Sequence, residues 1–165
     1  MAAEFSGNFA HTIDAKGRIT IPAAYREALG AGFTIGLNSK FSAVALYPRA
    51  KWDRIGEELS RIPDTDAKGM RYVRLINGNS FAGCDLDGQG RALIPPTLRT
   101  KTGLVKAIRF VGVGSYLEVW DEDRYLAECE AAENDEELLD YVNNSYFKPS
   151  INGNTPEGMD GRNER

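Results

Sequence analysis

The stretch Asp14-Ala15-Lys16-Gly17-Arg18 returns later in the chain as Asp87-Gly88-Gln89-Gly90-Arg91. Both copies continue in the same way, through Ile21-Pro22 to Arg26 and through Ile94-Pro95 to Arg99. All the shared residues have the same offset in the sequence: Asp87 follows Asp14 by 73 positions, and Arg99 follows Arg26 by 73 positions. The register holds for about 48 positions, and a repeat of that length decides architecture before local propensity does. The chain is therefore a tandem duplication.

Each copy begins with two short β segments on either side of the Asp-x-x-Gly turn. In the first copy these segments are residues 9–13 and 19–21. Asp at the first turn position accepts hydrogen bonds from turn amides, and Gly at the fourth takes the positive φ that closes a type I turn with a bulge. We expect Pro22 to be the first residue of a short helix that continues through the good helix formers at 23–29 and ends at Gly30.

Two further strands follow in each copy. Residues 33–37 and 43–47 have β character, and residues 107–113 and 116–120 mirror them in the second copy. Four short strands and one short helix are too small a unit to bury an apolar face. We therefore predict a mainly β protein with appended helices, of class α+β, in which the two copies pack together.

Helical segments are expected after each copy. Apolar residues recur at helical spacing on both sides of Pro63, which predicts a pair of helices between the copies. A second amphipathic region follows the second copy. Beyond Phe147, proline and glycine are frequent and apolar residues are few, so residues 149–165 are predicted to be a disordered tail.

Charge is unevenly distributed along the 165 residues, whose formal net charge is −4. Residues 121–140 hold ten acids and one base, whereas residues 1–120 hold 16 bases and 11 acids. A basic body with an acidic C-terminal helix is compatible with a polyanionic partner.

No apolar run reaches the roughly 18 residues of a membrane span, and the N-terminus lacks the layout of a signal peptide, so a cytoplasmic protein is expected. Cys84 and Cys129 form no CxxC pair and are not shared by the copies, which predicts reduced thiols rather than a disulfide or a zinc site. No cofactor is indicated.

The repeated arginine of the turn, Arg18 and Arg91, has two interpretations. It pairs with the turn aspartate or is solvated, or it binds a planar or phosphate acceptor through its rigid fork. Turn chemistry explains Asp and Gly without the arginine, and an exposed Asp–Arg pair contributes only about 0–1 kcal/mol. Lys16 is replaced by Gln89 in the second copy, so if both turns bind, the first is expected to bind more tightly.

The pattern Asp-x-x-Gly-Arg-x-x-Ile-Pro-x-x-x-Arg, which starts at Asp14 and at Asp87, is followed by Leu46-Tyr47-Pro48 in the first copy and by Glu118-Val119-Trp120-Asp121 in the second. In these features the chain resembles the MraZ family, over residues from about 5 to 145. The resemblance implies a swapped-hairpin, double-psi-like β barrel of AbrB type and a ring-shaped homo-oligomer. It also implies a transcriptional regulator, chiefly a repressor, of the bacterial division and cell-wall gene cluster that includes its own gene.

With this resemblance, the chain divides into five expected segments. These are a first AbrB-like repeat (5–52), a helical insert (53–77), a second AbrB-like repeat (78–125), a C-terminal helical segment (126–148) and the tail (149–165).

The family's association of this arginine with DNA carries over to Arg18 and Arg91. A two-stranded ribbon can enter a major groove, where arginine reaches guanine O6 and N7. We therefore predict that Arg18 reads base edges, that Lys16 holds a phosphate and that Arg91 supports them. The residues expected to shape the two turns are Asp14, Gly17, Asp87 and Gly90. The expected partner is double-stranded DNA of the protein's own promoter, which would make the protein nucleoid-associated.

Two other classes of function remain open at this stage. An enzyme is disfavoured because His11 is the only histidine and no catalytic arrangement repeats. The stronger alternative is a ring-forming structural or protein-interaction module without DNA binding, because apolar helical stripes and a duplicated body would serve assembly alone.

Overall fold

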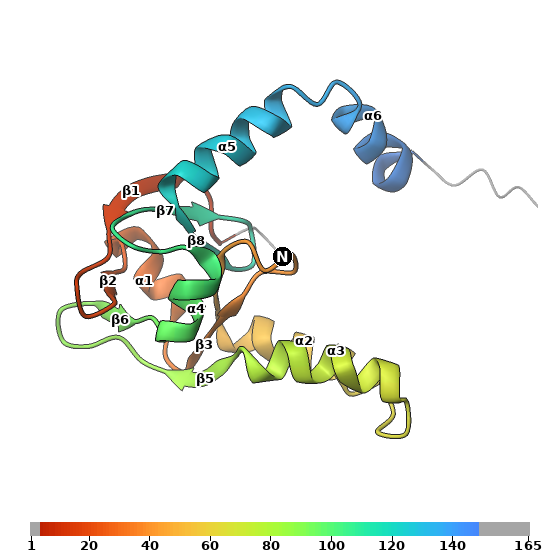
Figure 1. Cartoon of the computed structure of the whole chain (residues 1–165), viewed down its shortest axis with the longest axis horizontal. Helices are drawn as coiled ribbons and strands as arrows, with labels where there is room; N and C mark the ends of the chain where they lie inside the picture. Colours follow the sequence, from red (N-terminus) through yellow and green to blue (C-terminus); the bar gives the residue numbers. More distant parts are fainter. Residues whose placement is uncertain (1–3, 149–165) are drawn as a thin grey trace, which may run out of the picture. The chain divides into compact units, whose positions relative to one another are not determined.

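The computed structural model describes residues 4–148, in two compact units that divide after Glu128. The predicted tail, residues 149–165, lies outside the described residues. The first unit holds both repeats (Figure 1). The elements of the first repeat are β1 (Asn8–Thr12), β2 (Arg18–Thr20), α1 (Ala23–Leu29), β3 (Phe33–Leu37) and β4 (Val44–Tyr47). Those of the second are β5 (Phe81–Cys84), β6 (Arg91–Leu93), α4 (Pro96–Thr102), β7 (Ala107–Gly112) and β8 (Leu117–Asp121).

The two repeats exchange strands instead of folding separately. The larger sheet has the order β1-β7-β8-β4-β3-β5, so the first strand of each repeat pairs with the third strand of the other. The fourth strands, β4 and β8, pair antiparallel at the centre, with Ala45 opposite Glu118. These two residues are themselves 73 positions apart, so an approximate two-fold axis passes between them.

The second strands form a separate two-stranded ribbon. β2 and β6 pair antiparallel, with Ile19 opposite its own repeat-equivalent Ala92. Beyond the ribbon, Ile21 N donates to Gly90 O at 2.9 Å and Ile94 N donates to Gly17 O at 2.8 Å. The turn of each repeat is thus hydrogen-bonded to the chain of the other repeat.

The α+β class is confirmed, whereas a closed barrel is not. Within residues 4–148, β1 and β5 are the edges of the larger sheet, no pairing joins them, and the β2–β6 ribbon is a sheet of its own. The backbone hydrogen bonds therefore define an open six-stranded sheet beside a ribbon.

The short helices begin and end as the sequence predicts, with one difference at the start. Pro22 has the extended backbone of an N-cap (ψ 137°), so it precedes the helix instead of occupying its first turn. Pro95 is the equivalent N-cap of α4. Gly30 and Gly103 follow the two helices with positive φ angles of 66° and 71°.

One apolar core lies inside the first unit and takes residues from both repeats. Its largest fully buried side chains are Phe5, Phe33, Phe110, Ile19, Ile21, Leu29, Leu46, Ile94, Leu98, Ile108, Leu117 and Val44. Neither repeat could exclude water from these groups alone, which is the physical reason for the strand exchange.

Helices lie outside this core. The predicted insert is a pair, α2 (Arg49–Leu59) and α3 (Ala67–Gly78), which project from the β body (Figure 1) and have no fully buried residue. α5 (Glu122–Glu133) follows β8 and crosses the boundary between the units. The second unit contains α6 (Leu138–Val142) and the π-helical turn η1 (Asn143–Phe147). No helix among the described residues is long and apolar enough to span a membrane.

Candidate nucleic-acid interface

The first Asp-x-x-Gly-Arg turn is held together by its aspartate. Asp14 Oδ1 accepts hydrogen bonds from Lys16 N at 3.0 Å and from Arg18 N at 2.8 Å. Its Oδ2 accepts from Arg18 Nε at 2.7 Å. Gly17, with φ +84°, donates its N–H to Asp14 O at 3.0 Å. Gly17 thus has the positive φ, and Asp14 the hydrogen bonds from turn amides, that turn chemistry predicts, and the Arg18 side chain is bound to the same carboxylate.

The second turn repeats this geometry. Asp87 Oδ1 accepts from Gln89 N and Arg91 N, each at 2.9 Å, and Oδ2 accepts from Arg91 Nε at 2.8 Å. Gly90 has φ +73°. Because the backbones match, the chemical difference at the third position is the side chain alone, a Lys16 ammonium against a Gln89 amide.

These hydrogen bonds lower the pKa of both aspartates. For Asp14 the largest cause is the backbone hydrogen bond from Arg18, with smaller contributions from the Arg18 side chain and the Lys16 backbone. Asp87 has a lowered pKa for the equivalent reasons. A lowered pKa in the folded state means that the stabilising contribution is present above the usual aspartate pKa and is lost as the pH falls through the folded value.

The Asp–Arg pairing that turn chemistry alone predicts is therefore present. It orients the guanidinium group but occupies only one of its nitrogen atoms. Only Nε of each arginine bonds the aspartate. Among residues 4–148, no hydrogen-bond acceptor is found for the Nη atoms of Arg18 or Arg91. The side chains of Arg18 and Arg91 are 32% and 26% exposed. Each turn therefore presents an oriented guanidinium group whose Nη donors are available to a ligand.

The ribbon brings the two arginines to one face. Residues directly opposite in an antiparallel pair point to the same side, and here Arg18 faces Leu93 while Thr20 faces Arg91. These four side chains therefore share one face, and Ile19 and Ala92, which are buried, share the other. Arg18 and Arg91 are diagonal neighbours, a relation that places Cα atoms roughly 7–8 Å apart. Leu93, at 59% exposure, shows that this face is open to solvent.

Two further arginines contribute to the site, Arg26 and Arg99. A Cβ on Gly17 would lie 2.6 Å from Arg99 Cζ, and one on Gly90 would lie 2.7 Å from Arg26 Nε. Each guanidinium thus packs on the turn glycine of the other repeat. Arg26 Nε donates to Ile21 O and Arg99 Nε to Ile94 O, which anchors both side chains.

The sequence shows the repetition of Arg26 and Arg99 but assigns them no role. The repetition is the only sign in the sequence that these two arginines matter. The glycines that they contact lie in the other repeat, so the contacts cannot be inferred from spacing within one repeat. We name the exposed face of β2–β6 with its two turns the ribbon face. Its cations are Lys16, Arg18 and Arg91, and its acids are Asp14 and Asp87; the guanidinium groups of Arg26 and Arg99 pack against its two turns.

Three other kinds of chemistry, namely a metal site, a disulfide and a catalytic histidine, can be assessed in the described part of the chain. Residues 4–148 contain no cluster of three or more His, Cys, Asp or Glu that could hold a metal ion. Both cysteines are free thiols. His11 lies on β1 and is exposed, and its ring is nearly perpendicular to the ring of Phe110, with 5.9 Å between the centroids.

Comparison with known proteins identifies the family. The family model "MraZ protein, putative antitoxin-like" matches residues 5–74 and 82–140. The chain belongs to the MraZ family. A "Transcriptional regulator MraZ" from Lachnoclostridium phytofermentans is 38% identical over 140 residues, which covers 84% of this chain and 94% of the relative.

Other MraZ proteins are similar to a comparable extent. The "Transcriptional regulator MraZ" of Carboxydothermus hydrogenoformans is 37% identical and covers 78% of this chain and 89% of its own length. That of Limosilactobacillus reuteri is 38% identical and covers 83% of this chain and 96% of its own length. These MraZ relatives are named for transcriptional regulation and not for a reaction, in agreement with the prediction that the chain is no enzyme.

Proposed function

We propose that this MraZ-family chain is a sequence-specific DNA-binding transcriptional regulator. In this proposal it acts as a repressor of the division and cell-wall gene cluster that includes its own gene. The observation that carries the proposal is the ribbon face, where Arg18 and Arg91 lie on one solvent-exposed side of a two-stranded ribbon, each aimed by an aspartate.

The dimensions and donors of the ribbon face suit a major groove. A major groove about 12 Å wide admits a two-stranded β ribbon, and arginine donates two parallel hydrogen bonds to guanine O6 and N7. With Nε held by Asp14, Arg18 keeps its Nη donors for such a contact. The Lys16 ammonium, two residues earlier on an exposed turn, would contact a phosphate. Binding to the chromosome would hold the protein at the nucleoid, in the cytoplasm.

Two architectural proposals accompany this function. The hydrogen bonds from Ile21 to Gly90 and from Ile94 to Gly17 support an exchange of hairpins between the repeats, and the bridge between Ile13 and Ile19 joins the ribbon to the chain that follows β1. The first proposal is a swapped-hairpin barrel of AbrB type, in which the ribbon closes over the larger sheet. A ring-shaped homo-oligomer would present many ribbon faces at once, so that repeated promoter boxes are bound by avidity. The boundaries proposed for the segments are those expected from the sequence, at residues 52, 77, 125 and 148.

Fluorescence anisotropy across a salt series tests the DNA proposal. The duplexes are one from the protein's own upstream region and a scrambled duplex of equal composition. We expect Arg18→Ala to lose about 1–3 kcal/mol on the specific duplex and to lose sequence discrimination. Lys16→Ala should weaken binding to both duplexes equally and lower the salt slope by about one unit. Arg54→Ala, an exposed arginine on α2, is the matched charge control and should bind like the wild type.

The same measurement separates the proposal from its alternative. Equal, weak and salt-insensitive binding to both duplexes by wild type and Arg18→Ala would favour a protein-interaction ring without DNA binding. Retention of full sequence discrimination by Arg18→Ala would show that another surface reads the bases.

A further inference from the structure

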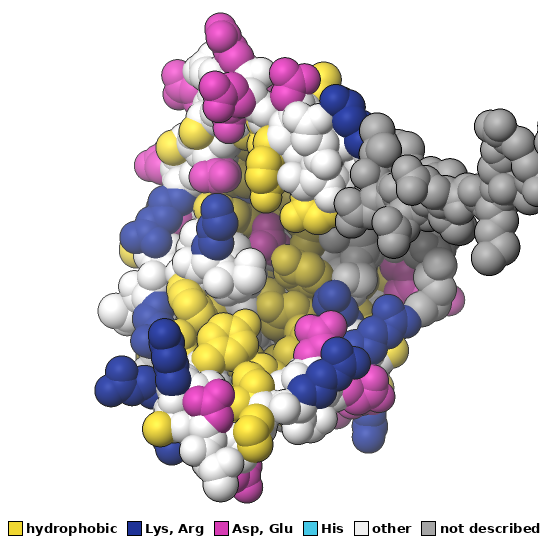
Figure 2. All heavy atoms as spheres, turned by 90° about the vertical axis from the view of Figure 1, so that its right-hand side faces the viewer, with side chains coloured by type: hydrophobic (Ala, Val, Ile, Leu, Met, Phe, Trp, Pro, Cys, Tyr) yellow, Lys and Arg dark blue, Asp and Glu magenta, His cyan; other side chains and the backbone are white. Residues whose placement is uncertain are grey.

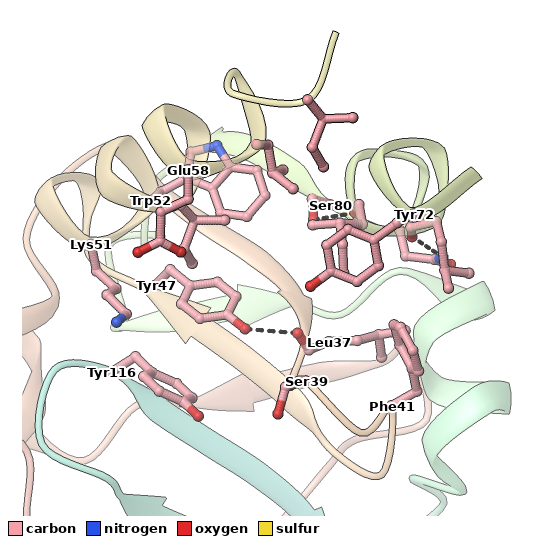
Figure 3. Close-up of a pocket in the computed structure, with 16 residues that line it drawn as sticks. Leu37, Ser39, Phe41, Tyr47, Lys51, Trp52, Glu58, Tyr72, Ser80 and Tyr116 are labelled. Atoms are coloured by element: carbon pink, nitrogen blue, oxygen red, sulfur yellow. Dashed lines mark hydrogen bonds between the residues drawn. The ribbon is translucent and has the colours of Figure 1, made fainter. Parts of the chain in front are cut away.

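An apolar pocket lies between the helical insert and the β body. It has a volume of about 290 Å³ (Figure 3). α2 contributes Trp52, Ile55 and Leu59 to its lining, and α3 contributes Tyr72, Leu75 and Ile76. We name this pocket and the two helix faces that line it the insert groove.

The walls of the insert groove are apolar although they include several polar side chains. In Figure 3 the rings of Tyr47, Trp52, Tyr72 and Tyr116 surround the opening. Tyr47 donates its hydroxyl to Leu37 O at 2.7 Å, so its polar end is satisfied inside the protein. What remains available to an occupant is mainly aromatic and aliphatic surface.

The insert groove has no covering layer within the first unit. Neither α2 nor α3 has a fully buried residue, and Tyr72 and Leu75 are 51% and 44% exposed. Figure 2 shows hydrophobic side chains gathered on the face from which the insert projects, with Lys and Arg side chains beside them. An apolar groove of this kind can bind the apolar face of an amphipathic helix.

The C-terminal helical segment of the chain has the complementary character. We name residues 138–147, which comprise α6 and η1, the arm. Its exposed large apolar side chains are Leu138 (40%), Leu139 (69%), Tyr141 (59%), Tyr146 (70%) and Phe147 (72%). The rings of Tyr141 and Tyr146 are in edge-to-face contact, 6.3 Å between centroids, which gathers the aromatic surface on one side. Five such residues in ten are more than a solvated helix needs.

The distribution of charge also indicates that the arm and the insert groove are complementary. Residues 129–147 carry six acids and no base; Asp140 lies in the arm and the other five lie directly before it. α3 carries Lys68, Arg71 and Arg74 and no acid, and helical spacing places these bases beside the apolar face of Tyr72 and Leu75. The apolar arm and the acidic residues that lead into it therefore match a basic helix with an apolar side.

The connections of the β body favour a second copy as the source of the arm. β4 and β8 are antiparallel, with Leu46 opposite Leu117. α2 follows the end of β4, and α5, which leads toward the arm, follows the end of β8. The insert and the start of α5 consequently leave this strand pair at opposite ends. One end of the body carries a groove and the other the base of an arm.

We propose that the arm of one copy binds in the insert groove of the next copy. This contact is heterologous, because different surfaces meet, and a heterologous contact repeated around an axis closes into a ring. The inference deepens the ring of the proposed function and does not depend on DNA binding.

Light scattering on the full-length chain, coupled to size exclusion and without DNA, tests the inference. Wild type should have several times the 18.2 kDa mass of one chain. An arm variant, Leu139→Asp with Tyr146→Asp, and a groove variant, Leu75→Asp, should each be monomeric. Val105→Asp, at an 81% exposed position outside both surfaces, is the matched control and should keep the wild-type mass.

Mixing the two monomeric variants gives the sharpest result. The groove variant keeps an intact arm and the arm variant keeps an intact groove, so one productive contact forms and the mixture should yield a 1:1 dimer that grows no further. Wild-type mass in the arm variant, a monomeric wild type, or no dimer in the mixture would each overturn the inference. None of these outcomes tests DNA binding. Anisotropy with a duplex that contains a single box measures DNA binding separately.

Discussion

At the scale of single residues, the two turns are built to hold one another. Gly17 must be glycine for two reasons: its φ is +84°, and the Arg99 guanidinium occupies the space where a Cβ would lie. Gly90 has the same relation to Arg26. The motif's second arginine is thus a structural residue of the opposite turn, and the pair of contacts fixes both turns on the ribbon.

Gly17→Ala should therefore destabilise the protein measurably. A left-handed backbone costs a non-glycine residue about 1–2 kcal/mol, which corresponds to a fall in melting temperature of about 2–8 °C for a chain of this size. Gly88→Ala is the control, because Gly88 has no positive φ and, apart from its two chain neighbours, no atom lies within 4 Å of the place that its methyl group would take. Thermal unfolding followed by circular dichroism measures both. Equal melting temperatures for the two variants would contradict this account.

Residue-level features divide clearly into those that the sequence could predict and those that it could not. The roles of Asp14 and Gly17 follow from turn chemistry, since both act on atoms within five residues. The stacking of Arg99 on Gly17 joins residues 82 positions apart and depends on how the repeats pack. Spacing within one repeat holds no information about that contact.

At the scale of elements, a buried polar cluster links the β3–β4 connection to β8. Glu118 Oε2 accepts from Asn38 Nδ2 at 2.9 Å, and its Oε1 accepts from Trp120 Nε1 at 3.1 Å. All three residues are buried. Asn38 Oδ1 in turn accepts from Ser42 N at 2.9 Å, which closes the connection. Glu118 belongs to the central strand pair, so this cluster fixes the connection to the middle of the sheet.

Glu118→Ala should be strongly destabilising, because it leaves the buried donors of Asn38 and Trp120 without this acceptor. An unsatisfied buried donor costs about 1–3 kcal/mol. Glu118→Gln keeps one acceptor oxygen and should lose roughly half as much. Glu57→Ala, at an exposed position on α2, serves as the control. Urea unfolding provides the three free energies, and a Gln variant as unstable as the Ala variant would show that both acceptor oxygens are needed.

Strand positions followed from alternation and turn signals, and β3 begins and ends where predicted. The pairing of those strands did not follow, because alternation identifies the buried face of a strand and not its neighbour. The exchange of β1 and β5 between repeats is a consequence of the shared core. A duplication that cannot bury its apolar face alone indicates that such packing occurs but not which strands pair.

At the scale of the whole molecule, assembly and DNA recognition are predicted to be separable. The ribbon face and the arm use different residues, so an arm variant should keep an intact reading surface. In the proposed function each ribbon face would make few contacts with DNA, so its affinity for one box is expected to be modest. Linkage of several faces converts later binding events into intramolecular ones, which can raise affinity by about 10²–10⁴-fold without any new contact.

Anisotropy on duplexes with one or two promoter boxes tests this separation. Wild type should gain about 100-fold or more from a second box placed one helical turn away, about 10–10.5 base pairs. It should lose most of that gain when the second box is shifted by half a turn, because the box then faces away. The arm variant Leu139→Asp with Tyr146→Asp should bind a single box as wild type does at equal chain concentration, and should gain only the statistical factor of about two from the second box. If the arm variant kept the full gain, avidity would have to arise from contacts other than the arm, because only linked ribbon faces can produce a dependence on helical phase.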